Sequence, residues 1–265
     1  MPANPYHSIE RGTPGRIGWR IHYFDEVGST QDVARELVQS GIAEGAVVVA
    51  EMQTAGRGRL GRSWHSPKGA SLYSTTILRP HVPIADVPRL SLVAGVAVAE
   101  ALEREAPGIV SLKWPNDIWL SRRKAGGILA EAVTDSQQRL TAVLLGIGIN
   151  VNLAPEEIPE ELRDKATSLY AALGRRVDRI AIAHALFSTL DSRYMEFVAR
   201  GFGAIRHDWE RFSALTGKRV VAGDGESREA GVVRGIDADG ALLLDVNGTI
   251  RRFLAGDVTI EGAYT

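Results

Sequence analysis

A chain of 265 residues with 45% hydrophobic residues can bury a substantial core, which fits one large domain or a large domain with a small one. This composition excludes disordered and fibrous proteins. No stretch reaches the roughly 20 apolar residues that cross a bilayer, and the N-terminal segment lacks the apolar centre of a signal peptide. The absence of cysteine excludes a disulfide framework, a thiolate metal site and a cysteine nucleophile, and the six histidines lack metal-ligand spacing. We therefore expect a cytoplasmic protein with no membrane partner.

The net charge of −1 argues against a polyanion-binding surface spread over the whole molecule. Residues 52–85, however, contain no acidic residue and five basic ones, so this stretch carries +5 and the remainder of the chain −6. The five are Arg57, Arg59, Arg62, Lys68 and Arg79. Positive charge is therefore concentrated in one short stretch.

The first half of the chain predicts three strands and two helices. Ser29 is typical of a helix N-cap with Asp32 at the third helical position, and Gly41 stops that helix. Its apolar face is Val33, Leu37 and Val38. The other elements are strands at 20–24, 46–52 and 72–78, and a helix at about 90–105.

The second half is rich in strands. Helical periodicity returns only at about 179–200, and residues 121–124 form a polar turn. Short strands separated by GDGE, DADG and NG turns predict a small barrel after Leu215. The expected strands are 118–120, 127–133, 142–149, 220–221, 231–236, 242–246, 249–253 and 258–260. Without a regular alternation of helix and strand, this order favours an α+β domain, at residues 1–214, followed by an all-β domain, at residues 215–265.

The sequence GRGRLGR at 56–62 follows a strand and formally matches G-x-G-x-x-G. A dinucleotide fold needs a helix at the third glycine, whereas here Ser63, Pro67 and Gly69 lead into another strand, so we reject that interpretation. No P-loop string is present either. Glycines leave the loop mobile, and guanidinium groups suit carboxylate and phosphate oxygens, which predicts a lid that orders over an anion. A solvated basic turn or a nucleic-acid contact is the alternative for this loop alone.

Three further strings carry polar or small residues next to strands. In KWPNDIWL at 113–120, Pro115 fixes a turn that displays Lys113, Asn116 and Asp117. In KAGGILAE at 124–131, Lys124 stands beside small residues, where it could neutralise a carboxylate and a developing phosphate charge, although a solvated hairpin lysine is the commoner case. The glycines of GIGINVN at 146–152 leave one sheet face bare, either for a flat ligand or for close backbone packing.

Together these strings resemble the biotin protein ligase family over nearly the whole chain. The resemblance rests on their order: STQD at 29–32, EMQTAGRGRLGRSW at 51–64, KWPND at 113–117, KAGGILAE at 124–131 and GIGINVN at 146–152. It implies a mixed sheet flanked by helices, similar to class II synthetases, and an SH3-like C-terminal domain ending in GDVTI at 256–260. Single strings would be weak, but five in family order are specific.

The resemblance also implies an activity and a site. Biotin and ATP, with Mg²⁺, would form biotinyl-5'-AMP, and a lysine of the biotin carboxyl carrier protein of acetyl-CoA carboxylase would then accept the biotinyl group. Lys124 and Arg59 would be catalytic. The implied biotin contacts are Ser29, Thr30, Gln53, Gly56, Arg57, Arg59, Lys124, Gly126, Gly127 and Gly148. The implied nucleotide contacts are Arg59, Arg62, Trp64, Lys113, Asn116, Asp117, Lys124 and Asn150.

Two departures and two alternatives accompany the resemblance. Leu60 stands where some relatives carry another arginine, and the few residues before Ser29 leave no room for a DNA-binding domain, so we expect a ligase that does not bind DNA. Family members can form homodimers by extending a sheet, and a homodimer is therefore among the expected assemblies. A lipoate or octanoate ligase or transferase is the nearest alternative, and a nucleic-acid-binding module is a more distant one.

Overall fold

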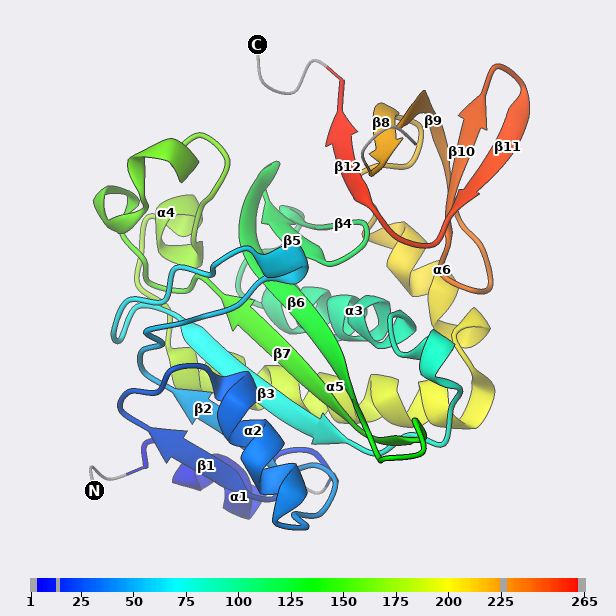
Figure 1. Ribbon diagram of the computed structural model, residues 1–265. Coiled ribbons are helices and arrows are strands. Elements are labelled where there is room, and N and C mark those ends of the chain that lie inside the picture. Colours follow the sequence, from blue (N-terminus) through cyan, green and yellow to red (C-terminus); the bar gives the residue numbers. More distant parts are fainter. Residues whose placement is uncertain (1–3, 13–14, 225–227, 262–265) are drawn as a thin grey trace.

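A computed structural model describes residues 4–12, 15–224 and 228–261 (Figure 1). The α-helices are α1 (His7–Gly12), α2 (Thr30–Gln39), α3 (Arg89–Glu103), α4 (Leu169–Leu173), α5 (Arg179–Arg200) and α6 (Gly203–Arg211). Single 3-10 turns are η1 (Arg59–Gly61), η2 (Ile84–Asp86), η3 (Pro155–Glu157) and η4 (Glu160–Leu162). No helix in these ranges is long and apolar enough to span a bilayer.

Seven strands form the first sheet, in the order β1-β2-β3-β7-β6-β5-β4. Only β1 and β2 pair in parallel, and every other neighbouring pair is antiparallel. The strands are β1 (Ile21–Phe24), β2 (Val47–Ala50), β3 (Leu72–Leu78), β4 (Val110–Lys113), β5 (Asp117–Leu120), β6 (Arg123–Thr134) and β7 (Leu140–Ile149). This mixed sheet matches the predicted α+β class.

Helices cover both faces of this sheet because its central strands are apolar on both sides. Val47 and Val49 of β2 point into the large core with α3 and α5, whereas Val48 between them packs under α2. This is the period-two alternation of a strand, and burial of each such side chain contributes about 1.5–3 kcal/mol. In Figure 1, α2 lies in front of the sheet and α3 and α5 lie behind it. Ser29 begins α2 as predicted, with its hydroxyl accepting from the Gln31 amide.

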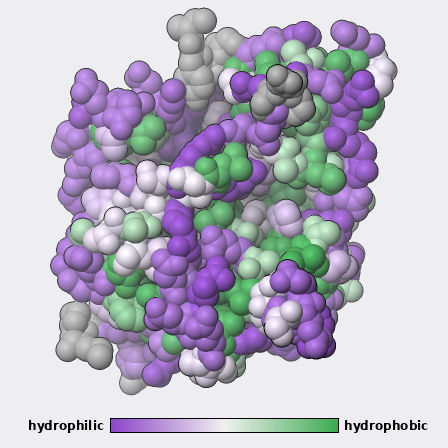
Figure 2. Space-filling view, viewed as in Figure 1, coloured by the Kyte–Doolittle hydropathy of each residue, from purple (hydrophilic) through white to green (hydrophobic). Residues whose placement is uncertain are grey.

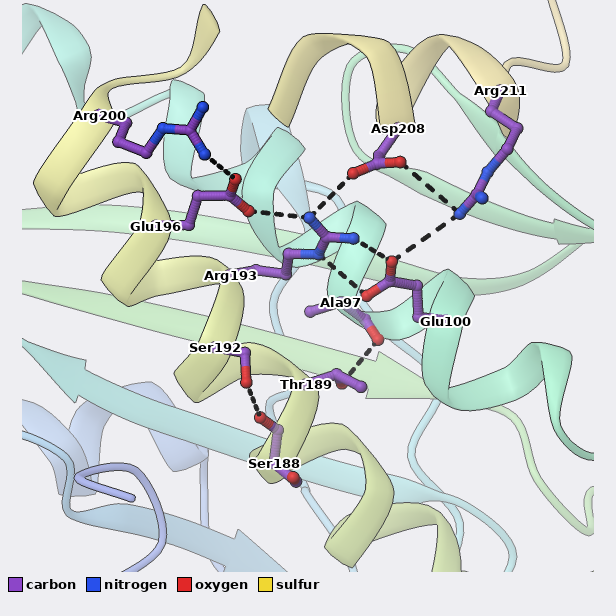
Figure 3. A network of polar contacts seen from close by, with 10 residues as sticks. All are labelled: Ala97, Glu100, Ser188, Thr189, Ser192, Arg193, Glu196, Arg200, Asp208 and Arg211. Carbon is purple, nitrogen blue, oxygen red and sulfur yellow. Dashed lines mark hydrogen bonds and ion pairs between the residues drawn. The ribbon is translucent and has the colours of Figure 1, made fainter. Parts of the chain in front are cut away.

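A polar network fastens the helices behind the sheet to one another (Figure 3). The guanidinium of Arg193 on α5 contacts three carboxylates: Glu100 on α3, Glu196 one turn along α5 and Asp208 on α6. Its side chain is 19% exposed, and these partners raise the pKa of Arg193 well above its ordinary value. The network therefore fixes the α6 segment, which leads to the C-terminal strands.

The last five strands form a separate antiparallel sheet in the order β11-β10-β9-β8-β12. They are β8 (Arg219–Gly223), β9 (Glu229–Ile236), β10 (Leu242–Val246), β11 (Thr249–Phe253) and β12 (Asp257–Ile260). Asn247 and Gly248 both have positive φ, 51° and 84°, as the predicted NG hairpin turn requires. The predicted C-terminal strands are therefore confirmed as one five-stranded sheet.

This second sheet is attached to the first domain by specific contacts. The buried indole of Trp114 donates to the carbonyl of Gly240 at 3.0 Å, and Arg89 on α3 binds the carbonyl and the carboxylate of Asp239. A β-carbon on Gly240 would be 2.6 Å from Leu92, so the turn approaches α3 closely. Figure 2, seen from the same side, shows a mostly hydrophilic surface with hydrophobic patches near the middle of the view.

Four short elements of the structure were not predicted, and one predicted turn is shorter than expected. Helices α1, α4 and α6 and strand β4 were not predicted, because each offers too few residues to show a periodicity. The turn predicted at 121–124 is also shorter, since Ser121 and Arg122 alone adopt positive φ and β6 begins at Arg123. Lys124 consequently extends from a strand. Part of the predicted GDGE turn lies outside the described residues.

Candidate functional site

A cavity of about 560 Å³ is enclosed by the first sheet, the arginine-glycine loop, residues 153–166 and strand β12. The predicted site residues that line it are Ser29, Thr30, Gln53, Arg57, Arg59, Arg62, Trp64, Lys113, Asn116, Asp117, Lys124, Gly127, Gly148 and Asn150. The other two, Gly56 and Gly126, pack against backbone. A β-carbon on Gly56 would be 2.6 Å from the carbonyl oxygen of Trp64, and one on Gly126 would be 2.8 Å from that of Gly148.

The start of α2 supplies one end of the cavity. The backbone amide and the hydroxyl of Thr30 both donate to Oε1 of Gln53, at 2.9 and 3.1 Å. Gln31, which was not among the predicted site residues, also lines this end. Its Nε2 donates to the carbonyl of Leu129, while its buried Oε1 has no hydrogen-bond partner within the described chain. A polar group free to bind a donor therefore lies beside Thr30 and Gln53.

The arginine-glycine loop is held in place at each of its arginines. Arg57 contacts Asp32 at 2.6 Å and Glu131 at 3.5 Å, and Arg62 pairs with Asp257 of β12. Arg59 donates instead to the amide oxygen of Asn116 at 3.1 Å. All three arginines are among the residues that line this cavity, so the loop brings positive charge to its edge. The predicted mobility of this loop stays a prediction.

Leu60, at the tip of this loop, is 65% exposed and has a φ of 55°. Left-handed backbone is uncommon for a residue with a β-carbon, and a leucine has no side-chain oxygen to stabilise it. The tip therefore carries local strain next to three cations.

The glycine-lined face of the sheet is covered by the indole of Trp64. Gly127 on β6 and Gly148 on β7 are paired in register. A β-carbon on Gly148 would be 2.7 Å from Nε1 of Trp64, and one on Gly127 would be 3.4 Å from the same ring. The Lys124 ammonium lies 5.4 Å from the ring centroid, within the range of a cation–π contact. These glycines thus provide the space that the indole occupies.

A carboxylate lies between two lysines on the strands β4, β5 and β6. Asp117 Oδ1 is 2.6 Å from the Lys124 ammonium, and its Oδ2 is 3.9 Å from that of Lys113. Burial lowers the pKa of Lys113, although the charge of Asp117 opposes this. Two ammonium groups around one carboxylate leave this part of the cavity positive, which suits an anionic ligand.

Residues 150–166 and β12 complete the walls. Asn150 is buried, and its Nδ2 donates to the carbonyl of Thr167, which leaves its amide oxygen to act as an acceptor. The apolar wall of Leu153, Ile158, Pro159 and Leu162 was not predicted, because these residues stand before, between and within the glutamate-rich turns η3 and η4. The lining residues Asp257, Val258 and Thr259 were not predicted either.

The pair between Arg62 and Asp257 connects the C-terminal sheet to the loop. Burial alone would raise the pKa of Asp257. The hydrogen bond and the charge of Arg62 nevertheless hold this pKa below its usual value. The same hydrogen bond raises the pKa of Arg62. The arginine-glycine loop and strand β12, which are far apart in the sequence, are therefore joined by an ion pair.

Two family models match this chain. Residues 23–150 match the biotin/lipoate A/B protein ligase family, and residues 216–260 match the biotin protein ligase C-terminal domain. Among curated relatives, the bifunctional ligase/repressor BirA of Bacillus subtilis is 39% identical over 92% of this chain and 75% of its own length. A biotin--[acetyl-CoA-carboxylase] ligase of Mycobacterium tuberculosis is 36% identical over 91% of this chain and 89% of its own length.

Solved structures give the same relationship at the level of the fold. A biotin protein ligase from Aquifex aeolicus, solved with biotin and ATP, superposes with a TM-score of 0.79 and 33% identity, over 91% of this chain and 98% of that one. A biotin protein ligase from Leishmania major in complex with biotinyl-5-AMP superposes with a TM-score of 0.61 and 27% identity, over 88% of this chain and 98% of that one.

Proposed function

This chain belongs to the biotin protein ligase family, and from that premise we propose that its cavity carries out ATP-dependent ligation of biotin in two steps. First, a carboxylate oxygen of biotin attacks the α-phosphorus of ATP, pyrophosphate leaves, and biotinyl-5'-AMP forms. Second, the amine of a carrier lysine attacks the acyl carbon and AMP leaves. A free carboxylate does not acylate an amine at useful rates, whereas an acyl adenylate carries a good leaving group.

One observation carries this proposal: cations from separate segments converge on a single cavity. Arg59 and Arg62 come from the loop, Lys124 from β6 and Lys113 from β4, and all four line the same space. A carboxylate that approaches a triphosphate to within 4 Å meets a repulsion of about 4 kcal/mol per pair of charges at an effective dielectric near 20. Fixed cations at that point lower the barrier without reorganising during the reaction.

We assign biotin to the end of the cavity beside α2. Thr30 and Gln53 already form a hydrogen-bonded pair there and would meet the polar head group, with Ser29 and Arg57 beside them. Gln31 joins this group because it lines the same end of the cavity and its Oε1 has no partner among the described residues. Gly56 and Gly126 serve the same subsite indirectly, by allowing close approach of the surrounding groups, whereas Gly127 and Gly148 act through Trp64, which lies against them.

We assign the nucleotide to the end formed by Trp64 and residues 150–166. The indole offers one flat face to a nucleobase, Asn150 offers an acceptor, and Leu153 and Ile158 exclude water. Lys124 lies between this end and the biotin end, where it would neutralise the attacking carboxylate and the α-phosphate together. Asn116 acts through Arg59, because its amide oxygen already accepts from that guanidinium.

Mg²⁺ would enter with ATP. In the parts of the chain that the structure describes, no three His, Asp or Glu side chains are grouped to hold a metal ion, so phosphate oxygens and water would supply most of its ligands. Asp117 is the lining carboxylate nearest to Lys113 and Lys124 and would contribute an oxygen to that ion. The ion would offset charge on the phosphates.

We propose that residues 1–214 form the ligase domain and residues 215–265 the SH3-like domain, which completes the cavity through Asp257. The proposed carrier is the biotin carboxyl carrier protein of acetyl-CoA carboxylase, because the similar Mycobacterium tuberculosis protein is named for that substrate. The cytoplasm is the proposed compartment.

The direct test is incubation of the protein with biotin, ATP, Mg²⁺ and a carrier domain, followed by intact-mass measurement of the carrier. We expect a mass increase of one biotinyl group, and the same reaction with lipoate should give none. Modification by lipoate but not by biotin would replace the proposed substrate. Absence of biotin-dependent ATP–pyrophosphate exchange would refute the proposal as a whole.

A further inference from the structure

A continuous chain of hydrogen bonds connects the two ends of the cavity. The hydroxyl of Thr75 donates to that of Thr30 at 2.9 Å, which donates to Oε1 of Gln53. On the other side of the same amide, Gln53 Nε2 donates to the hydroxyl of Ser66 at 3.0 Å, and that hydroxyl donates to the carbonyl of Trp64 at 3.0 Å. Every bond in this chain runs in the same direction, an arrangement in which each bond polarises the next.

Ser66 occupies the junction of this chain with the base of the arginine-glycine loop. The backbone carbonyl of Ser66 accepts a hydrogen bond from the backbone N–H of Gln53 at 3.3 Å. The backbone N–H of Trp64 donates to the carbonyl of Gly56 at 2.8 Å. A β-carbon on Gly56 would lie 2.6 Å from the Trp64 carbonyl oxygen, 2.7 Å from the Ser66 hydroxyl and 3.1 Å from Gln53 Nε2. Gly56, the first glycine of the loop, therefore leaves space for the Ser66 hydroxyl and for its two hydrogen-bond partners.

We infer that Ser66 is a positioning residue that couples the biotin subsite to the nucleotide subsite. This inference rests on the proposed function, and it adds a role for a residue that does not itself line the cavity. Ser66 is 6% exposed, and its hydroxyl makes both of its hydrogen bonds within the protein. Its two bonds set the position of the Trp64 carbonyl relative to the amide plane of Gln53.

The coupling follows from the limited number of bonds that each group can make. Both acceptor positions of Gln53 Oε1 are filled by Thr30, so a ligand that contacts Thr30 restrains Thr30 and the plane of the Gln53 side-chain amide together. A fixed amide directs Nε2 at Ser66, and Ser66 in turn fixes the backbone of Trp64. Biotin thereby prepares the indole for the nucleobase, which reduces the ordering cost of the second ligand.

The test measures the affinity of α,β-methylene-ATP with Mg²⁺ in the absence and presence of saturating biotin, by calorimetry. This analogue cannot release pyrophosphate, so both ligands stay intact. In the parent protein we expect biotin to tighten the nucleotide by about tenfold, within the usual range of coupling between sites. In Ser66→Ala we expect this factor to fall to about one, while the affinity for biotin alone changes less than about threefold.

Three variants separate positioning from a general loss of structure. Ser66→Thr keeps the hydroxyl and should restore the coupling, and Ser66→Cys keeps the size with a weaker donor and should retain only part of it. Ser71→Ala is the matched control, because it removes the hydroxyl of another buried serine outside the chain of hydrogen bonds and should leave the coupling at the parental value. If Ser66→Ala does not fold, Ser66→Cys decides the question by the same measurement.

Parental coupling in Ser66→Ala or Ser66→Cys would overturn the role of Ser66, and so would a parent that exchanges pyrophosphate actively but shows no coupling. An equal loss of coupling in Ser71→Ala would overturn it as well, because the effect would then be unspecific. A parent without biotin-dependent exchange would instead refute the proposed function. The two failures are therefore distinguishable within one set of samples.

Discussion

Substitution of Gly148 by alanine tests whether the close contact of Trp64 with the sheet is necessary for nucleotide binding. The new β-carbon would lie 2.7 Å from Nε1 and 2.8 Å from Cε2 of the indole. Ordinary contacts between such atoms are roughly 3.5–4.0 Å, so the ring must lift by about 1 Å. Because the ring lies at the edge of a cavity, it can move into that space, and we expect the fold to tolerate the change.

The magnitude follows from the usual cost of inserting one carbon into packed structure. Overpacking costs about 1–3 kcal/mol, and here it would displace the indole of Trp64 rather than the backbone. If the nucleobase binds against that ring, the affinity for ATP should fall by about 5- to 150-fold. The stability of the fold should change little, because alanine is favoured over glycine in a strand by about 0.5–1 kcal/mol.

Gly146→Ala provides a matched comparison on the same strand and face. Its β-carbon would lie 2.8 Å from Nε2 of Gln31, at the biotin end of the cavity. Steady-state ATP–pyrophosphate exchange, measured with each substrate varied in turn, should show opposite patterns. The KM for ATP should rise in Gly148→Ala, whereas the KM for biotin should rise in Gly146→Ala.

A double-mutant cycle decides whether Gly148 acts through the indole. In a Trp64→Ala background the alanine at 148 meets no ring, so it should have little further effect on the KM for ATP. Equal changes for both substrates in the two single variants would refute the reasoning. A full effect of Gly148→Ala in the absence of the indole would refute it too.

Four other variants test separate parts of the structure. Lys124→Ala should reduce adenylate formation by about 10²- to 10³-fold with little change in melting temperature, and an unchanged exchange rate in the folded variant would reject its catalytic role. Arg59→Ala should release biotinyl-5'-AMP faster in a chase experiment, whereas equal retention would count against the lid. Because the pKa of Asp257 is depressed in the fold, its stabilisation is present above the ordinary carboxyl pKa near 3.8 and is lost as the pH falls through the folded value. The melting temperatures of the parent and Asp257→Asn should therefore converge in acid, and a constant difference would contradict this. Arg193→Met should cost about 2 kcal/mol in urea unfolding, because carboxylates around it lose hydrogen bonds, and no loss would mean that the network in Figure 3 does not stabilise the fold.

The elements with strong local signals could be predicted from the sequence. The helix at 179–200 and the strand at 72–78 were predicted with the bounds that the structure has, because long periodic or uniformly apolar runs leave little choice. Strand β4 was missed, since Val110–Lys113 shows apolar alternation over only four residues, although it pairs with the nearby strand β5. Helix α6 was missed because only Ile205 and Trp209 in it are buried.

Site residues could be predicted from the sequence where the side-chain type alone suggests a function. They could not be predicted where the function depends on the position of the side chain in the fold. Arginines between glycines and a lysine beside small residues suit anion binding by their chemistry, and the order of the five strings decided between this interpretation and a solvated surface. Gln31 gives no such signal, because its importance arises from a buried oxygen without a partner in the folded chain. Asp257 is also hidden in the sequence, since 195 positions separate it from Arg62. The glycine face was predicted to meet a flat ligand or another backbone, whereas in the fold the indole of Trp64 lies against it.

Most of the cations around this cavity are paired before any ligand arrives, and that arrangement determines which of them an anion meets first. Arg57 is bound to Asp32, Arg62 to Asp257 and Lys124 to Asp117, so a phosphate or carboxylate must compete with a protein carboxylate for each of these three. Such pairs hold flexible side chains in place and limit repulsion within the cluster, at the cost of weaker attraction for the ligand. Arg59 differs, because it donates to the neutral amide oxygen of Asn116. A neutral acceptor orients the guanidinium without offsetting its charge, and an incoming anion therefore gains more from Arg59 than from its neighbours in the loop.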